Sequence, residues 1–168
     1  TQIMKEDLDG TWDQIASGLE TGKQPAFEMF RDLLILSTTS NTDVPQQWNG
    51  SAATTSNLGG SPPNFAFSVK HKNFMFAAGV ASNPSRLYYG ASLAAENWSG
   101  GGSIDIDPDD GDRLVGAISH KNELLIFKGP NRLSIHRLTG SAGTGSAAFA
   151  RVPFVPGVGG INHQTIFR

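Results

Sequence analysis

The sequence predicts an all-β fold made of repeated antiparallel sheets. Glycine (20 residues) and proline (9) are abundant in this chain of 168 residues, whereas charged residues make up only 17%. This composition is typical of many short elements joined by tight turns. Short apolar runs separated by turn-forming pairs follow one another along the chain, and the order of strand, turn and strand returns, which indicates a repeat.

The first expected element is a β-hairpin within residues 2–15. Asp9-Gly10 lies between the mixed apolar and polar runs that start at Ile3 and Thr11. An Asp-Gly pair between two such runs is the strongest short-range signal for a hairpin. A helix over residues 11–20 is the competing interpretation.

A strand, a turn and a second strand are expected next. The apolar run in residues 31–37 predicts the first strand, residues 38–43 form a polar loop, and residues 44–50 return as the second strand. Residues 51–63 are rich in Ser, Thr, Asn and Gly, so we expect a surface loop there.

The same plan then returns twice. Further strands are predicted at residues 65–69, 74–78, 86–89, 104–106, 115–119, 123–127, 132–138 and 149–155. Pro153 places the last of these at a sheet edge or a bulge. Glycines in residues 157–160 turn the chain into a final expected strand over residues 161–167.

A short sequence repeat supports three units of similar shape. Val69-Lys70-His71-Lys72-Asn73 corresponds to Ile118-Ser119-His120-Lys121-Asn122, and an apolar strand starts within two positions after each. A period of about 40–50 residues with several strands per unit is the signature of propeller blades. We therefore expect a propeller-like arrangement with units at residues 1–58, 59–113 and 114–168. Because a closed propeller needs about 4–8 blades, we expect the chain to be an incomplete propeller from a longer protein.

Several classes of function find no support in the sequence. The net charge is −2 with scattered Lys and Arg residues, which disfavours specific nucleic-acid binding, and no run has the length of a membrane span. With no cysteine, thiol chemistry is excluded. The serine-hydrolase, zinc-protease and phosphate-loop motifs do not occur, so we predict no catalytic residues, no cofactor and no enzyme. His71 and His120 hold equivalent repeat positions and are expected to share one structural role. His136 and His163 stand alone.

The weak candidates for metal binding are Asp105, Asp107 and Asp109. Alternating carboxylates followed by Gly111 suggest a calcium loop, but this glycine comes one residue late for an EF-hand and the twelfth position would be Gly116. Asp, Pro and Gly dominate turns for backbone reasons, so we favour a structural turn over a metal site.

The region from Gly59 to Phe167 resembles the structural tail proteins of bacteriophages, particularly the nozzle (tail tubular) proteins of short-tailed phages. The order and spacing of a set of motifs carry this resemblance. They are Gly60-Ser61-Pro62-Pro63, the run from Lys72 to Gly79, the run from Asn83 to Ser92, Asn97-Trp98, Ile104-Asp105-Ile106, Gly111-Asp112, the run from Leu124 to Lys128, and Leu133-Ser134-Ile135.

The resemblance implies a virion protein that assembles as a homo-oligomer, commonly a hexameric ring, around the tail channel near the tail tip. Its expected partners are other tail or adaptor proteins, and contact with nucleic acid is limited to lining the channel. One alternative is a tail module that binds glycans on the host surface. A less favoured alternative is a glycan-cleaving propeller enzyme, which needs two suitably spaced carboxylates.

Overall fold

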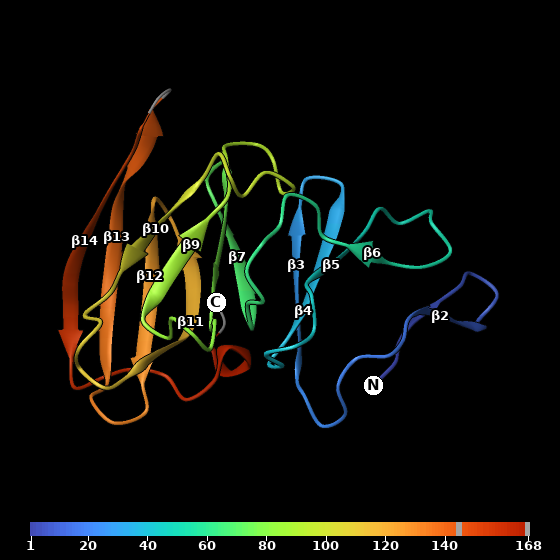
Figure 1. Ribbon diagram of the computed structural model, residues 1–168, viewed down its shortest axis with the longest axis horizontal. Helices are drawn as coiled ribbons and strands as arrows, with labels where there is room; N and C mark the ends of the chain where they lie inside the picture. Colours follow the sequence, from blue (N-terminus) through green and yellow to red (C-terminus); the bar gives the residue numbers. More distant parts are fainter. Residues whose placement is uncertain (144–145, 167–168) are drawn as a thin grey trace.

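The computed structural model describes residues 1–143 and 146–166 and confirms the all-β prediction (Figure 1). Three four-stranded antiparallel sheets and one two-stranded hairpin follow one another along the chain. Within each four-stranded sheet, hydrogen-bonded neighbours are also neighbours in sequence. The repeated plan predicted from the sequence is therefore a series of antiparallel meanders.

The strands divide among the sheets as follows. The hairpin contains β1 (Ile3–Glu6) and β2 (Trp12–Ala16), and the first sheet contains β3 (Pro25–Phe30), β4 (Leu33–Thr38), β5 (Gln46–Trp48) and β6 (Ser56–Asn57). The second sheet contains β7 (Phe67–His71), β8 (Phe74–Ala78), β9 (Arg86–Tyr89) and β10 (Gly102–Asp105). The third contains β11 (Arg113–His120), β12 (Glu123–Gly129), β13 (Ser134–Gly143) and β14 (Ser146–Pro156).

The predicted N-terminal hairpin is confirmed, and the competing helix over residues 11–20 is wrong. Glu6 pairs with Trp12 across the two strands. Gly10 takes a left-handed φ of 82° in the turn, and the Asp9 carboxylate accepts a hydrogen bond of 3.0 Å from the backbone N–H of Thr11. These turn interactions reverse the chain before a helix can start.

The first sheet differs from the prediction at two places. The strand expected from residue 31 begins at Leu33, because Arg31 has a left-handed φ of 58° and forms a turn with Asp32. β3 precedes this turn and was not predicted, although its residues alternate between Phe27 and Met29 on one side and half-buried Glu28 on the other. The short β6 lies inside the segment expected to be a loop.

The prediction of a final strand over residues 161–167 is also wrong for the described residues. His163–Thr165 forms a 3₁₀ turn, labelled η1, and Phe167 lies outside the described residues. The side chain of Asn162 accepts a hydrogen bond from the backbone N–H of Gln164, which caps the turn. Such local side-chain to backbone bonds compete with strand formation. The prediction for Pro153 is confirmed, since β14 is an edge strand and its register shifts opposite Ile135 and His136.

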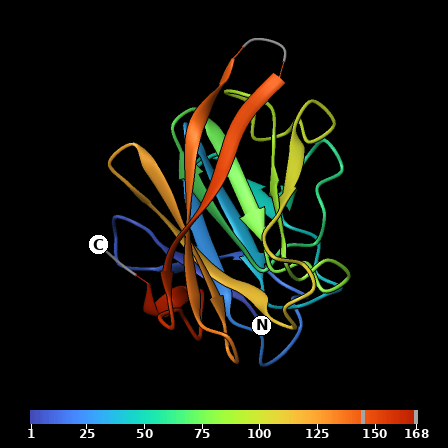
Figure 2. The same cartoon turned by 90° about the vertical axis from the view of Figure 1, so that its left-hand side faces the viewer.

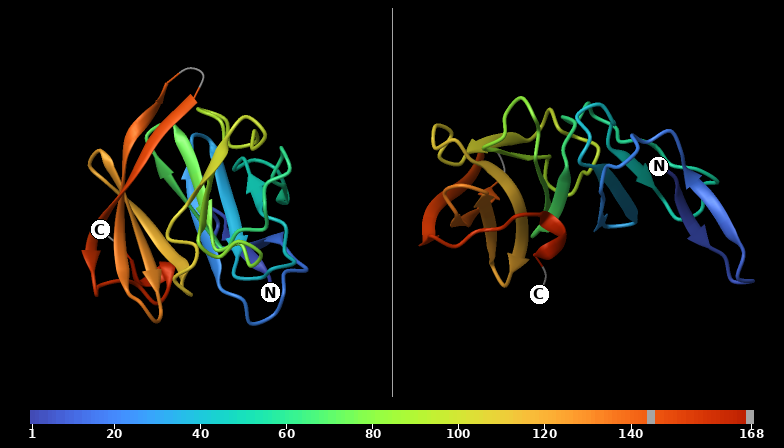
Figure 3. Two further views of the ribbon diagram at one scale, coloured as in Figure 1. Left: turned by 60° about the vertical axis from the view of Figure 1, so that its left-hand side comes forward. Right: turned by 90° about the horizontal axis from the view of Figure 1, so that it is seen from below.

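The first strands of the three sheets lie next to one another. β7 contacts both β3 and β11, and Figures 2 and 3 show the three sheets stacked in chain order, with the N-terminal hairpin beyond the first sheet. This arrangement is consistent with the blades of a propeller, in which small sheets pack face to face.

The second sheet is covered on both faces. Along β8, the side chains of Phe74 and Phe76 enter the core shared with the third sheet, whereas Met75 and Ala77 enter the core shared with the first sheet. Successive side chains of a strand point to opposite faces, so one strand contributes to two cores. Each sheet therefore depends on its neighbours to remove its apolar faces from water.

Candidate functional site

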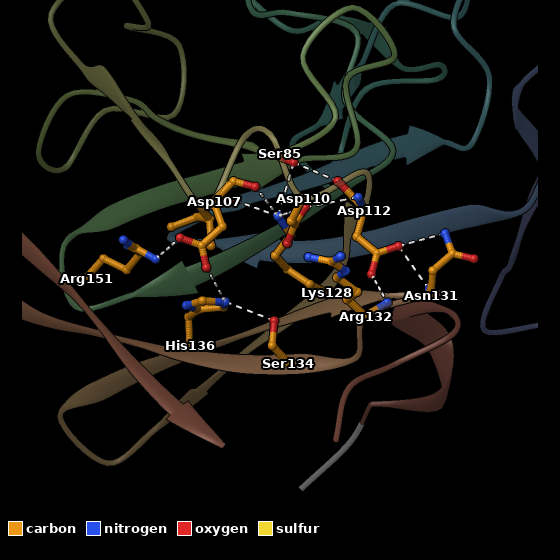
Figure 4. A network of polar contacts seen from close by, with 11 residues as sticks. Ser85, Asp107, Asp110, Asp112, Lys128, Asn131, Arg132, Ser134, His136 and Arg151 are labelled. Carbon is orange, nitrogen blue, oxygen red and sulfur yellow. Dashed lines mark hydrogen bonds and ion pairs between the residues drawn. The ribbon is translucent and has the colours of Figure 1, made fainter. Parts of the chain in front are cut away.

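The site with the most unusual chemistry is a buried polar network between the loop after β10 and the third sheet (Figure 4). The loop carries the carboxylates that the sequence singled out, and the third sheet supplies the cations.

Asp105 does not take part in the network. It ends β10 and pairs with Arg86 on β9 through two hydrogen bonds of 2.6 and 2.9 Å. The hydrogen bond from Arg86 lowers the pKa of the Asp105 carboxyl. This bidentate pair has the geometry of a cross-strand contact that stabilises the sheet surface.

Asp107 and Asp109 also fail to converge with Asp105. The Asp107 carboxylate contacts the guanidinium of Arg151 on β14, while Asp109 is exposed in the turn. Across residues 1–143 and 146–166, no group of three or more His, Cys, Asp or Glu side chains could hold a metal ion. The fold directs these carboxylates toward arginines or solvent and provides no shared cavity for them.

Lys128 lies at the centre of the network and its side chain is completely buried, with 0% exposed. The Nζ atom donates to the backbone carbonyls of Ile106 and Asp107 at 2.6 and 2.7 Å, to Asp110 Oδ1 at 2.8 Å and to Ser85 Oγ at 3.2 Å. A buried ammonium group is tolerated only when it is paired and hydrogen-bonded, and here every donor has an acceptor. Lys128 thus ties the loop of the second sheet to the third sheet.

Asp112 is a second buried charge at the same junction, with 4% of its surface exposed. One carboxylate oxygen accepts from the backbone N–H and the side-chain amide of Asn131 at 2.9 and 3.0 Å, and the other accepts from the backbone N–H of Arg132. Burial raises the pKa of the Asp112 carboxyl, but these hydrogen bonds together with the charge of Lys128 lower it by more, so that the pKa lies below its usual value. Asp112 therefore fixes the turn between β12 and β13.

His136 brings together the residue types of a hydrolase triad without its geometry. Its Nε2 atom lies 3.0 Å from Ser134 Oγ and 3.6 Å from Asp107 Oδ2. In a catalytic triad the serine and the carboxylate contact opposite nitrogens of the imidazole, because the carboxylate orients the base for the nucleophile. Here both contact Nε2, and Nδ1 is buried without a partner among the described residues. Burial lowers the pKa of His136, which favours the neutral ring. The arrangement supports packing, not nucleophilic catalysis.

The network was not predicted from the sequence, which treated His136 as standing alone and placed Lys128 between two expected strands. One signal was present for Lys128, because it is in phase with Leu124 and Ile126 along β12, and these two side chains are buried. An alternating strand places positions 124, 126 and 128 on the same face. The acceptors, in contrast, come from segments that are far apart in sequence.

The prediction that His71 and His120 share one structural role is wrong. Both precede the same hairpin turn in their sheets, but His71 is buried and bonds Ser119 at 2.8 Å, whereas His120 is exposed. The difference arises because β7 lies between two neighbouring sheets.

A hollow of about 500 Å³ lies where β3, β7 and β11 begin, next to η1. His163 stacks on Phe67 there, with ring centroids 4.6 Å apart, and burial lowers the pKa of His163. Arg113 also lines the hollow. The other lining residues are mostly apolar or carry amide groups.

None of the family models, curated proteins and solved structures with which the chain was compared matches it. In the described part of the chain, no helix is both long and apolar enough to cross a membrane.

Proposed function

We propose that this chain is a non-catalytic structural module that assembles through the faces of its stacked sheets, as a subunit of a bacteriophage tail near the tail tip. The observation that carries the assembly role is an apolar sheet face turned away from the rest of the stack. The motifs that resemble tail nozzle proteins supply the viral setting.

This apolar face belongs to the first sheet. Phe27 and Met29 on β3 are 48% and 54% exposed. Their cross-strand partners on β4 are Leu36 and Leu34, and Leu34 is paired in turn with Trp48 on β5. Leu36 is covered by Ala16 and Leu19, while the remainder of the face stays accessible. Large apolar side chains gathered on one accessible sheet face mark an interaction surface.

The partner we propose for this face is the sheet stack of a second copy of the chain. Within the stack, each neighbouring pair of sheets buries an apolar core, and the same packing between copies extends the stack. Contacts between different faces of identical subunits are heterologous, and they form a closed ring when the rotation from one subunit to the next closes. A hexameric ring around a tail channel, with other tail or adaptor proteins at its ends, follows the resemblance.

The pairing of the candidate carboxylates argues for this role over glycan cleavage. Glycosidases need two carboxyl groups on either side of the scissile bond. Asp105 and Asp107 instead contact Arg86 and Arg151, and Asp110 contacts Lys128. The first pair joins two strands of one sheet, the other two join the loop after β10 to the third sheet, and all three carboxylates are engaged.

The assembly role is tested by measuring the mass of the protein in solution with light scattering. We expect Phe27→Glu with Met29→Glu to shift the protein from oligomer to monomer, because charges on this face oppose burial. Val158→Glu, at a position with 50% exposure on the chain after β14, is the matched control and should leave the oligomer intact. A monomeric parent protein, or equal behaviour of both variants, would refute assembly through this face. Immunogold labelling of phage particles tests the viral setting separately.

A further inference from the structure

The three sheets place a basic residue at the same structural position. Arg31, Lys72 and Lys121 are each the first residue of the two-residue turn between the first and second strands of a sheet. All three have left-handed backbone conformations, with φ values of 58°, 54° and 52°. We call these residues the turn cations.

The turn cations lie at one end of the stack, because the first strands of the three sheets run in the same direction. At the starting end, Ser37 Oγ, near the end of β4, bonds the carbonyl of Ala66, just before β7. At the far end, Arg31 donates to the carbonyl of Leu93, whose own N–H bonds the carbonyl of Asn73 beside Lys72. The bond from His71 to Ser119 places the end of β11 next to the end of β7.

The turn cations are exposed, and Arg31 and Lys72 donate only to backbone carbonyls among the described residues. Arg31 donates to a backbone carbonyl at 3.0 Å and Lys72 to the carbonyl of Gly140 at 2.6 Å. Lys121 has no side-chain partner among residues 1–143 and 146–166. Lys70, also exposed, adds a fourth positive charge on β7. Acidic residues also lie in this part of the stack: Asp32 shares the turn of Arg31, Glu28 is on β3, Glu96 follows Leu93 in the same loop, and Glu123 is paired with Arg137. The three turns themselves carry three positive charges against the one negative charge of Asp32.

We propose that this end of the stack binds the sugar-phosphate backbone of a nucleic acid without reading its sequence. Sheets stack about 10 Å apart, so the turn cations form a row roughly 20 Å long. Duplex DNA presents one negative charge about every 1.7 Å along its axis. A phosphate can therefore lie close to each turn in any orientation of the duplex relative to the row. An acidic peptide would need carboxylates spaced to match the turns. Phosphate contacts from Lys and Arg give affinity without sequence preference.

The proposed DNA-binding surface is not apparent from the sequence, in which the positive charges are scattered. Arg31, Lys72 and Lys121 are far apart along the chain, and only the stacking of the sheets aligns them. The proposed DNA binding does not depend on the viral setting, because it rests on the positions of the three turns alone.

The test measures fluorescence anisotropy of a labelled DNA duplex of random sequence at several NaCl concentrations. We expect a dissociation constant of about 10⁻⁴ to 10⁻⁶ M and a slope of log K against log salt of about −2.7 for three phosphate contacts. The variant Arg31→Asn, Lys72→Asn, Lys121→Asn should bind at least about tenfold more weakly and lose most of that slope. Asparagine tolerates a left-handed backbone, so these changes preserve the turns.

The matched control removes three cations from the opposite end of the stack, with Lys23→Asn, Arg113→Asn and Arg132→Asn. It changes the net charge equally and should bind DNA like the parent protein. Equal weakening in both variants, no binding by the parent protein at low salt, or preference for polyglutamate over DNA would each overturn the proposal. Circular dichroism and the thermal midpoint of both variants verify that the fold is retained.

Discussion

The imidazole of His71 on β7 and the hydroxyl of Ser119 on β11 share a hydrogen bond of 2.8 Å that joins the second sheet to the third. His71 is 2% exposed. Burial, with a smaller contribution from the charge of Lys72, lowers the pKa of His71 to about 4. The packing of the second sheet against the third is thus coupled to the neutral state of the His71 imidazole.

This link predicts that the protein loses stability in mild acid. In the unfolded chain His71 takes up a proton near its ordinary pKa of 6.5, whereas in the folded chain it does so near 4. The contribution of neutral His71 to the free energy of unfolding should therefore be complete above pH 6.5. It should decrease as the pH falls from 6.5 to 4, by up to roughly 3 kcal/mol. The lowered pKa values of His136 and His163 act in the same direction. Urea unfolding at pH 7.5 and at pH 4.5 measures the difference.

Replacing the histidine isolates its share of this pH dependence. His71→Gln keeps a side chain that can hydrogen-bond Ser119 but does not titrate, so the loss of stability between pH 6.5 and 4 should be smaller. His120→Gln, at the equivalent exposed position, should leave the pH dependence unchanged. An unaltered pH dependence in His71→Gln would show that other groups cause the acid sensitivity.

Lys128→Met is expected to destabilise the protein by about 3–5 kcal/mol. The change leaves Asp110 and two buried carbonyls without their shared donor, which costs far more than the loss of an exposed ion pair. Lys121→Met removes an exposed lysine and should change the free energy of unfolding by no more than about 0.5 kcal/mol. Chemical unfolding at neutral pH compares the two. Adding Asp110→Asn to Lys128→Met should recover part of the loss, and a similar small effect in both single variants would contradict the network's structural role.

The chain after β14 depends on glycines for its close approach to the third sheet. A Cβ atom at Gly159 would collide with the backbone carbonyl of Lys128, and one at Gly129 would collide with the carbonyl of Gly160. We expect Gly159→Ala to cost about 1–3 kcal/mol and to expose residues 157–166 to limited proteolysis. Val158→Ala, at an exposed position of the same segment, is the control. Equal protease resistance of the two variants would disprove the close packing.

Calcium is not expected to stabilise the protein through Asp105, Asp107 and Asp109. Arg86 and Arg151 already neutralise the first two carboxylates, and Asp109 lies apart from them in solvent. The thermal midpoint should be the same in millimolar Ca²⁺ and in EDTA. A thermal midpoint that rises with Ca²⁺ in the parent protein but not in Asp107→Asn would contradict this prediction and support a metal site.

Strands and turns could be predicted well where the local pattern was strong. Asp9-Gly10 predicted the first hairpin, and the paired segments before Lys72-Asn73 and Lys121-Asn122 predicted the repeated turns. β3 was missed because Arg31-Asp32 lacks that motif although it forms the equivalent turn. The prediction of a final strand failed because Asn162 caps a 3₁₀ turn with a side-chain hydrogen bond. The apolar content of the segment does not reveal this bond.

The sequence by itself determined the all-β class, the meander order of the strands and their repetition, because side-chain alternation and turn chemistry act over a few residues. Only the tertiary structure decided that Lys128 and His71 are buried, that Asp105 and Asp107 face arginines, and that three basic turns share one end. Each of these outcomes depends on contacts between sheets, where the partners of a charge come from distant segments and burial sets its energy.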